Sequence, residues 1–202
     1  HIFGTKNGYI ALLGTDKYGR DMLSRILFGG RVSLAIGWVG VTISIILGII
    51  FGVTSGFMGG IVDNIIQRLI EILQSIPGIP LWMVLSVAMP PQWSSIQIYF
   101  GITIILSLRG WTGFARILRG MTLSERGADY VMAAKNLGAS NARIIGVHLV
   151  PSLLSYIIVA VTLRVPAMIL AETALSFLGL GIRPPMTSWG VLLIEAQSAH
   201  RL

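Results

Sequence analysis

Long apolar segments separated by short polar stretches set the pattern of this chain. They cover residues 32–57, 61–89, 96–115 and 152–177. A helix of about 20 apolar residues crosses the hydrocarbon core of a bilayer, so each segment is long enough to span it. We therefore predict an all-α fold, a polytopic transmembrane helical bundle with four spans in this chain.

The first predicted span carries small residues at every fourth position. They are Gly40, Ser44, Gly48, Gly52 and Gly56. In a helix this spacing keeps them close to one face, and side chains of this size let a second helix approach to backbone contact. We expect the stripe to be a helix-packing seam, either inside this chain or against a partner subunit.

The second predicted span is interrupted by Pro77 and Pro80. Each proline lacks a backbone donor, and such a break is tolerated in a membrane only where protein or a water-filled cavity satisfies the freed carbonyl groups. Broken helices of this kind are a feature of transport pathways. Asp63, Arg68 and Glu71 precede the break and are expected at a solvated helix end.

Three ionisable residues, Arg109, Arg164 and Glu172, lie inside predicted spans. A charge at the centre of a bilayer costs about 2.5 to 3.5 kcal/mol on insertion scales, so such residues usually pair or line a polar cavity. Arg164 and Glu172 are about two turns apart, too far for a direct pair, so each requires a partner elsewhere. Arg109 is expected either to snorkel or to face the bundle interior. All three are candidates for a translocation pathway.

The composition is that of an integral membrane protein. Of 202 residues, 54% are apolar and only 11% are charged, whereas about a quarter are charged in soluble domains. The mean hydropathy is +0.80. The formal net charge of +7 comes from basic residues that border the apolar runs, so membrane lipid rather than nucleic acid is the expected partner. The chain has no cysteine, which removes disulfides and thiolate metal sites.

The segments outside the spans differ in character. Residues 1–31 are amphiphilic, and Thr15 or Asp16 is predicted to cap a short helix lying along the membrane surface. A solvated lead-in is the alternative. Residues 175–190 contain glycines and prolines that forbid a regular helix through their middle, so we predict an ordered loop with Trp189 at the membrane interface.

A polar segment at 124–151 combines charges with small residues. Ser124 is predicted to cap a helix over 128–137, Gly138 to end it, and Ser140 to cap a second helix. The result is a helix-turn-helix with little side-chain bulk, which suits close approach by another protein. An ordered connection between two spans is the alternative.

Motifs for catalysis or metal binding are missing from the sequence. It contains neither the Gly-x-x-x-x-Gly-Lys-Ser/Thr phosphate loop nor His-Glu-x-x-His, and His1, His148 and His200 are widely separated. We therefore predict no enzymatic activity, no metal site and no cofactor bound by this chain. If ATP drives its function, ATP and magnesium must bind to another chain.

The polar segment resembles the cytoplasmic loop of importer-type permease subunits of ABC transporters. That pattern reads Glu-Ala-Ala, three residues, Gly, nine residues, Ile, any residue, Leu, Pro. The residues in register are Ala133, Ala134, Gly138 and Pro151. The residues that depart from it are Met132 in place of Glu, His148 in place of Ile and Val150 in place of Leu.

The strings at 14–25 and 175–190 are similar to the C-type permeases for dipeptides, oligopeptides and nickel, and the matches together cover nearly the whole chain. The resemblance implies a multi-pass protein of the bacterial inner (cytoplasmic) membrane. It also implies one further span before His1 and one after Leu202, in a six-span subunit. Residues 1–31 would then be an extracytoplasmic lead-in, and 32–202 a permease domain with a cytoplasmic coupling loop at 116–150.

The resemblance further implies partners and a mechanism. The partners are a homologous B-type permease, two cytoplasmic ATPase subunits and an extracytoplasmic substrate-binding protein. ATP-driven closure of the ATPase pair would reach the spans through the coupling loop and switch the pathway from one side to the other. The residues expected to carry this coupling are Ala133, Ala134, Gly138, His148 and Pro151.

Other functions stay open at this point. Within the family, the cargo is a di- or oligopeptide or, alternatively, nickel, glutathione or a sugar. Outside it, an ATP-independent secondary carrier or channel would use the broken span and the buried charges as its site. A purely structural membrane anchor is the third alternative.

Overall fold

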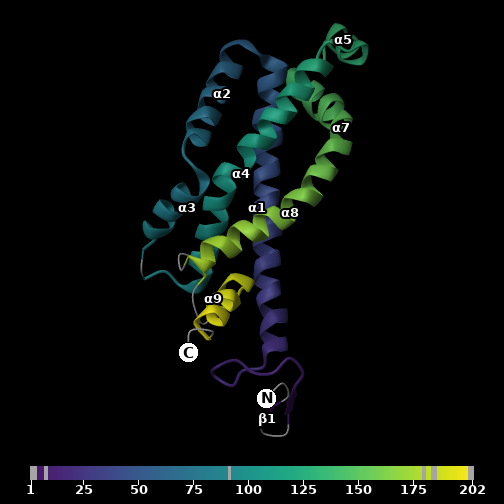
Figure 1. Ribbon diagram of the computed structural model, residues 1–202. Helices are drawn as coiled ribbons and strands as arrows, with labels where there is room; N and C mark the ends of the chain where they lie inside the picture. The colour runs from purple at the N-terminus through teal and green to yellow at the C-terminus, as the bar shows by residue number, and fades with distance from the viewer. Residues whose placement is uncertain (1–3, 7–8, 91, 179–180, 183–185, 200–202) are drawn as a thin grey trace.

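The computed structural model describes residues 4–6, 9–90, 92–178, 181–182 and 186–199. Three of its helices are long and apolar enough to cross a membrane: α1 (Met22–Met58), α4 (Ser95–Glu125) and α8 (Leu154–Phe177). α1 is the central element, because both α4 and α8 pack along it (Figure 1). The all-α prediction is confirmed.

A bent helix pair follows α1. α2 (Gly60–Ser75) and α3 (Gly78–Val87) meet at an angle of 82° and count together as a fourth span if the pair is taken as one. The bend falls at Pro77, which directly precedes α3 and cannot donate a backbone hydrogen bond to α2. The predicted interruption of the second span is therefore confirmed.

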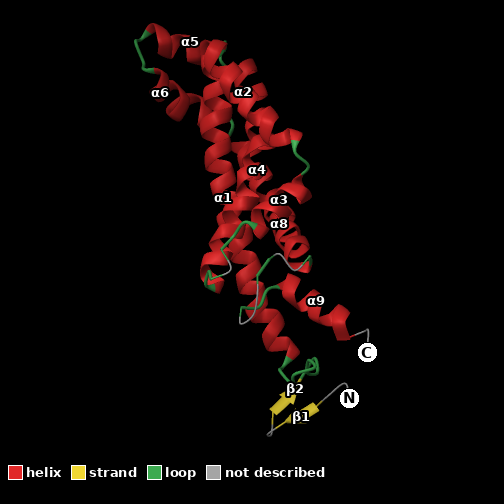
Figure 2. Ribbon diagram, turned by 90° about the vertical axis from the view of Figure 1, so that its left-hand side faces the viewer, coloured by secondary structure: helices red, strands yellow, loops and turns green. Residues whose placement is uncertain are grey.

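Shorter elements complete the described part of the chain. Two strands pair antiparallel before α1, and a run of short helical segments connects α4 to α8. These elements are β1 (Gly4–Lys6), β2 (Tyr9–Ala11), α5 (Asp129–Asn136), α6 (Asn141–Arg143), the π-helical turn η1 (Ile144–Leu149), α7 (Val150–Ser152) and α9 (Trp189–Ala199). Figure 2 shows the strand pair and α5–α6 at opposite ends of α1.

The predicted surface helix at the N-terminal end is wrong. Its apolar residues form the first turns of α1, which is capped by Asp21 accepting a hydrogen bond from the Ser24 amide at 2.9 Å. The predicted boundary between residues 31 and 32 therefore falls inside α1. The glycine pair Gly29 and Gly30 does not break the helix, because both residues lie tightly against the chain at Ser188 and Trp189.

Two helix boundaries also differ from the sequence prediction. Ser124 does not cap α5, because it lies in the last turn of α4 and its hydroxyl donates to the Met121 carbonyl. α4 thus extends ten residues beyond the predicted span end at 115, since the arginine, leucine, methionine and glutamate residues there are good helix formers. Ala128 precedes α5 without a side-chain cap.

The C-terminal loop is partly helical. α8 continues to Phe177, and Trp189 opens α9 instead of closing a loop. The Trp189 indole N–H donates to the Ile26 carbonyl at 3.1 Å, which ties α9 to α1. Within the predicted loop, residues 179–180 and 183–185 lie outside the described residues.

Candidate functional site

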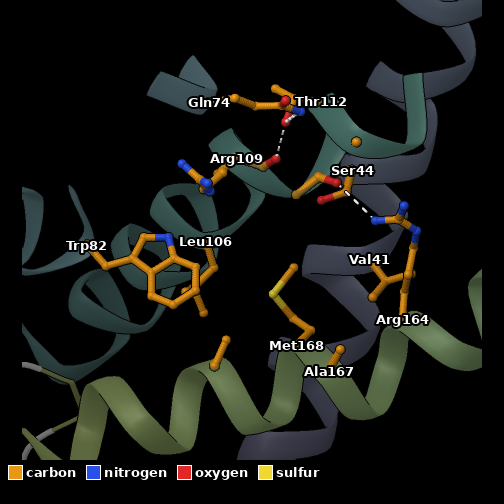
Figure 3. A pocket seen from close by; sticks show the side chains of 13 residues that line it. Val41, Ser44, Gln74, Trp82, Leu106, Arg109, Thr112, Arg164, Ala167 and Met168 are labelled. Carbon is orange, nitrogen blue, oxygen red and sulfur yellow. Dashed lines mark hydrogen bonds between the residues drawn. The ribbon is translucent and has the colours of Figure 1, made fainter. Parts of the chain in front are cut away.

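A pocket of about 330 Å³ opens among α1, the α2–α3 bend, α4 and α8 (Figure 3). Small and apolar residues form much of its wall. The polar side chains that line it are Ser44, Gln74, Trp82, Arg109, Thr112 and Arg164. We call it the arginine pocket.

Arg109 holds the broken span together. One terminal nitrogen of its guanidinium donates to the Leu73 carbonyl at 3.1 Å and also to the Ile76 carbonyl. In an unbroken helix these carbonyls would accept from the amides four residues later, and those positions are Pro77 and Pro80. Arg109 therefore faces the break and supplies the donors that the two prolines lack.

Arg164 approaches the pocket from α8. Its guanidinium donates to the Gly110 carbonyl at 3.0 Å and lies over the Phe114 ring, 4.9 Å from its centroid. These contacts join α8 to α4. Arg109 and Arg164, which the sequence suggested separately, thus line one pocket.

Glu172 lies away from this pocket. It is fully buried, and its carboxylate accepts hydrogen bonds from Ser33 at 3.1 Å and Ser176 at 2.7 Å. The Ser33 bond connects α8 to α1. In the structure Glu172 therefore joins α8 to α1, and its place in a translocation pathway stays a prediction.

Sequence reasoning missed three pocket residues. The Gln74 side chain donates to the Thr112 hydroxyl at 3.1 Å across the α2–α4 interface, and Trp82 reaches the pocket from α3. Polar residues inside apolar runs were a usable signal for Gln74 and Thr112. Nothing in the local pattern marks Trp82.

The small-residue stripe packs inside the chain. A Cβ atom at Gly48 would lie 2.5 Å from the Phe114 ring, and one at Gly52 would lie 2.5 Å from the Ala115 carbonyl oxygen. A Cβ atom at Gly56 would lie 2.7 Å from the Arg119 carbonyl oxygen. The stripe is therefore the contact line between α1 and α4. Two further stripe residues border the arginine pocket, Ser44 as part of its lining and Gly40 through Met168.

Asp63 is not a solvated helix end as predicted. Its side chain is 13% exposed and accepts two hydrogen bonds from Arg119, at 2.6 and 2.5 Å, and a third from Ser55. It thereby fastens the start of α2 to α1 and α4. Arg68 and Glu71 do form an exposed pair, 2.9 Å apart, as expected for a solvated surface.

The helix-turn-helix is formed at the far end of the bundle. Gly138 has φ +78° and ends α5 in the left-handed conformation, as predicted. The Ser140 hydroxyl accepts from the Arg143 amide and caps α6, also as predicted.

A hollow of about 720 Å³ lies over this turn. We call it the coupling hollow, after the predicted coupling residues in its lining. Its lining includes Tyr130, Ala133, Ala134, Leu137, Gly138, Arg143 and His148.

The structure thus brings four of the five predicted coupling residues to one surface. Pro151 is the exception and lies in α7, beyond the hollow. Leu137 is 88% exposed at the rim, an unusual position for a large apolar side chain. Among the residues that the structure describes, no three His, Cys, Asp or Glu side chains gather as metal ligands would.

Four charged residues meet at the end of the bundle that carries β1 and β2, which we call the strand end. Asp16 accepts from Arg20 at 2.6 Å and from Arg25 at 2.8 Å, and both arginines also contact Glu195 of α9. Burial raises the pKa of Asp16, but hydrogen bonds from Arg20 and Tyr18 outweigh it and hold that pKa below its usual value. Hydrogen bonds from Arg25 likewise lower the pKa of Glu195.

This ion cluster predicts an acid-sensitive end of the bundle. Because both carboxyl pKa values are lower in the folded state, their stabilisation is complete above the unfolded values near 4 and is lost as pH falls through the folded values. We expect the melting temperature in detergent to stay level from about pH 7 to pH 5 and to fall below about pH 4.

Asp16→Asn tests this prediction, because it leaves Arg25, whose side chain is only 10% exposed, with one partner fewer. We expect the free energy of unfolding to fall by about 1 to 3 kcal/mol at pH 7, and the melting temperature to fall less steeply below about pH 4 than in the parent. Glu71→Gln, in the exposed pair, is the control and should change stability by less than about 0.5 kcal/mol. An Asp16→Asn protein with the parental melting curve at every pH would contradict the prediction.

The fold and the site together define a class of protein. Apolar helices of spanning length, one of them broken, surround a pocket with two arginines, and this is a multi-pass helical protein of the cell membrane. Residues 26–199 match the family described as "Binding-protein-dependent transport system inner membrane component", and the chain belongs to that family.

Curated relatives agree with this assignment. The chain is 42% identical over 179 residues to the dipeptide transport system permease protein DppC of Bacillus subtilis, covering 89% of the chain and 54% of the relative. It is 42% identical over 191 residues to the oligopeptide transport system permease protein OppC of Haemophilus influenzae, covering 95% and 59%. It is 37% identical over 186 residues to the glutathione transport system permease protein GsiD of Pectobacterium atrosepticum, covering 92% and 60%. The chain spans a little over half the length of these relatives.

Proposed function

We propose that this chain is the core of a C-type permease subunit of an ATP-driven importer that moves di- and oligopeptides across the cytoplasmic membrane. The observation that carries the proposal is the coupling hollow, a small-residue docking surface built at one end of a membrane bundle. The peptide cargo is supported by the similarity to permease proteins of dipeptide and oligopeptide transport systems.

In this proposal the hollow faces the cytoplasm and receives one of two ATPase subunits. Its lining includes the small residues Ala133, Ala134 and Gly138, which let a partner segment approach closely, and the exposed Leu137 offers an apolar contact. ATP and magnesium are held by those ATPase subunits. The strand end of the bundle then faces the substrate-binding protein, and a B-type permease completes the pathway.

The contacts beneath the hollow give a route for the motion. The Lys135 ammonium lies 4.9 Å from the Phe57 ring centroid at the end of α1, and Arg126 donates to the Gly56 carbonyl at 3.5 Å. Ile144 and Leu149 of η1 are fully buried in a hydrophobic core that also contains Phe57 of α1 and Leu118 of α4. A displacement of α5 is therefore transmitted to the adjoining ends of α1 and α4 rather than absorbed by a loose loop.

Glutathione is the second candidate cargo, favoured by the name of the relative from Pectobacterium atrosepticum. Competition decides between the two. In vesicles that contain the complete importer, unlabelled glutathione is expected to leave the uptake of a labelled dipeptide unchanged, whereas an unlabelled oligopeptide reduces it.

The docking step is tested by co-purification of the full-length permease, co-expressed with its neighbouring genes. Ala133→Asp places a charge on an exposed residue of the hollow. We expect the ATPase to remain with the parent and to fall at least about tenfold in the variant, the equivalent of about 1.4 kcal/mol. Asn136→Asp, exposed on the same helix but outside the hollow, is the matched control. A parent that retains no ATPase would overturn the proposal.

A further inference from the structure

The arginine pocket concentrates hydrogen-bond donors and positive charge. Two guanidinium groups, of Arg109 and Arg164, reach it, and no described residue of its lining carries a carboxylate. The bonds they make inside the chain use one nitrogen of each guanidinium, although a guanidinium has five N–H donors. The pocket therefore retains donors for a ligand.

Two further donors at this pocket lack a partner among the residues that the structure describes. They are the Ser44 hydroxyl and the Trp82 indole N–H, and both atoms are buried. Ser44 as a residue is only 2% exposed. Buried polar groups are nearly always hydrogen-bonded in proteins, so two unsatisfied groups at one pocket point to a missing acceptor. Figure 3 shows Ser44, Trp82 and the two arginines around the same space.

We propose that this pocket binds the carboxylate of the transported peptide on its way through the membrane. The inference rests on the proposed function, which supplies the cargo class. A carboxylate has two acceptor oxygens and no donors, so it satisfies arginine, hydroxyl and indole groups together. An amine or a neutral amide would leave several of them unpaired.

The two arginines have different roles in this site. Arg164 is the carboxylate ligand, because its single hydrogen bond to Gly110 leaves most of its donors available. Arg109 is a positioning residue that holds the bend between α2 and α3, which carries Gln74 and Trp82 to the pocket. Leu106 and Met168 supply apolar wall that accepts different peptide side chains.

The first test compares two peptides that differ only in a free carboxyl or a carboxamide at the C-terminus. Initial uptake is measured in proteoliposomes that contain the full importer and its binding protein. For each protein we take the uptake rate of the free-carboxyl peptide divided by that of the carboxamide peptide. This ratio in a variant is then divided by the ratio in the parent, so that any preference of the binding protein cancels. For Arg164→Gln we expect this quotient to fall about tenfold or more, with Arg164→Lys keeping part of the preference.

Two arginine variants serve as comparisons. Arg116→Gln changes an exposed arginine of α4 outside the pocket and should leave the quotient at one. Arg109→Gln should slow both peptides equally, as a positioning residue does. If Arg164→Gln also slows both peptides equally, Arg164 does not bind the carboxylate of the cargo. An acidic side chain of a neighbouring subunit that fills the pocket would give this result. A parent that imports neither peptide would overturn the proposed function itself.

A second test requires no uptake. The chain has no cysteine, so Ala167→Cys provides one thiol in the pocket lining. In the detergent-purified complex, the free-acid peptide is expected to slow alkylation of this thiol on the labelled chain, and the amide to have little effect. The protection should disappear when Arg164→Gln is added. Equal protection by the two peptides, or none, would overturn the inference.

Discussion

Replacing Gly52 with leucine is expected to remove nearly all folded protein from the membrane. At this position α1 touches the backbone of α4, and a Cβ atom would lie 2.5 Å from the Ala115 carbonyl oxygen and 2.8 Å from its Cα. Backbone atoms cannot rotate away, so the two helices must separate. Overpacking costs about 1 to 3 kcal/mol where side chains can adjust, and we expect at least about 3 kcal/mol here.

The measurement is the yield of monodisperse protein in mild detergent together with its melting temperature. Gly120→Leu is the matched control, because Gly120 lies on α4 with open space around it. It is expected to melt like the parent. If Gly52→Leu gave the same yield and melting temperature as Gly120→Leu, the tight contact between α1 and α4 would be refuted.

Gly138→Leu is expected to separate ATP hydrolysis from transport. Open space surrounds Gly138, so leucine meets no clash, but φ of +78° is unfavourable for a residue with a Cβ atom. The strain, about 1 to 2 kcal/mol, is relieved if the turn between α5 and α6 rearranges. The coupling hollow then changes shape. We expect uptake per ATP hydrolysed to fall about tenfold while hydrolysis continues.

Simultaneous measurement of phosphate release and peptide uptake in proteoliposomes checks this result. Gly138→Asn should behave nearly as the parent, because asparagine tolerates the left-handed region. Gly127→Leu, at an exposed glycine just before α5 that also has open space around it, controls for added bulk. An unchanged ratio of uptake to hydrolysis in Gly138→Leu would remove Gly138 from the coupling mechanism.

Features set by neighbours along the chain were predictable from the sequence. Apolar length gave the spans, Pro77 gave the bend, and Gly138 and Ser140 gave the turn and cap of the helix-turn-helix. Each depends on the backbone preferences of a few adjacent residues. The N-terminal boundary of α1 shows the limit of such reasoning. Asp16 looked like a cap, but its carboxylate is used by Arg20 and Arg25, and Asp21 caps the helix.

Contacts between residues far apart in the sequence could not be predicted. Asp63 looked solvated because Arg119, its partner, lies on another helix. The sequence left Arg109 two roles, snorkelling or facing the bundle interior. Its hydrogen bonds to the carbonyls of Leu73 and Ile76 depend on how α2 and α4 pack together. Ser44 fits the small-residue stripe by its size, and the spacing of the stripe does not reveal that Ser44 also lines the arginine pocket. Local periodicity identifies which face a residue occupies, and only the assembled bundle shows what that face meets.

The bond between Arg109 and the broken span has an evolutionary consequence. Without the arginine, the carbonyls of Leu73 and Ile76 would lack the donor that replaces the proline amides. Without Pro77 and Pro80, restored amides would compete for those carbonyls, and the partly buried Arg109 guanidinium would lose its acceptors. A change at any one of the three positions is thus unfavourable alone. We expect Arg109 and the two prolines to be inherited, and lost, as a set.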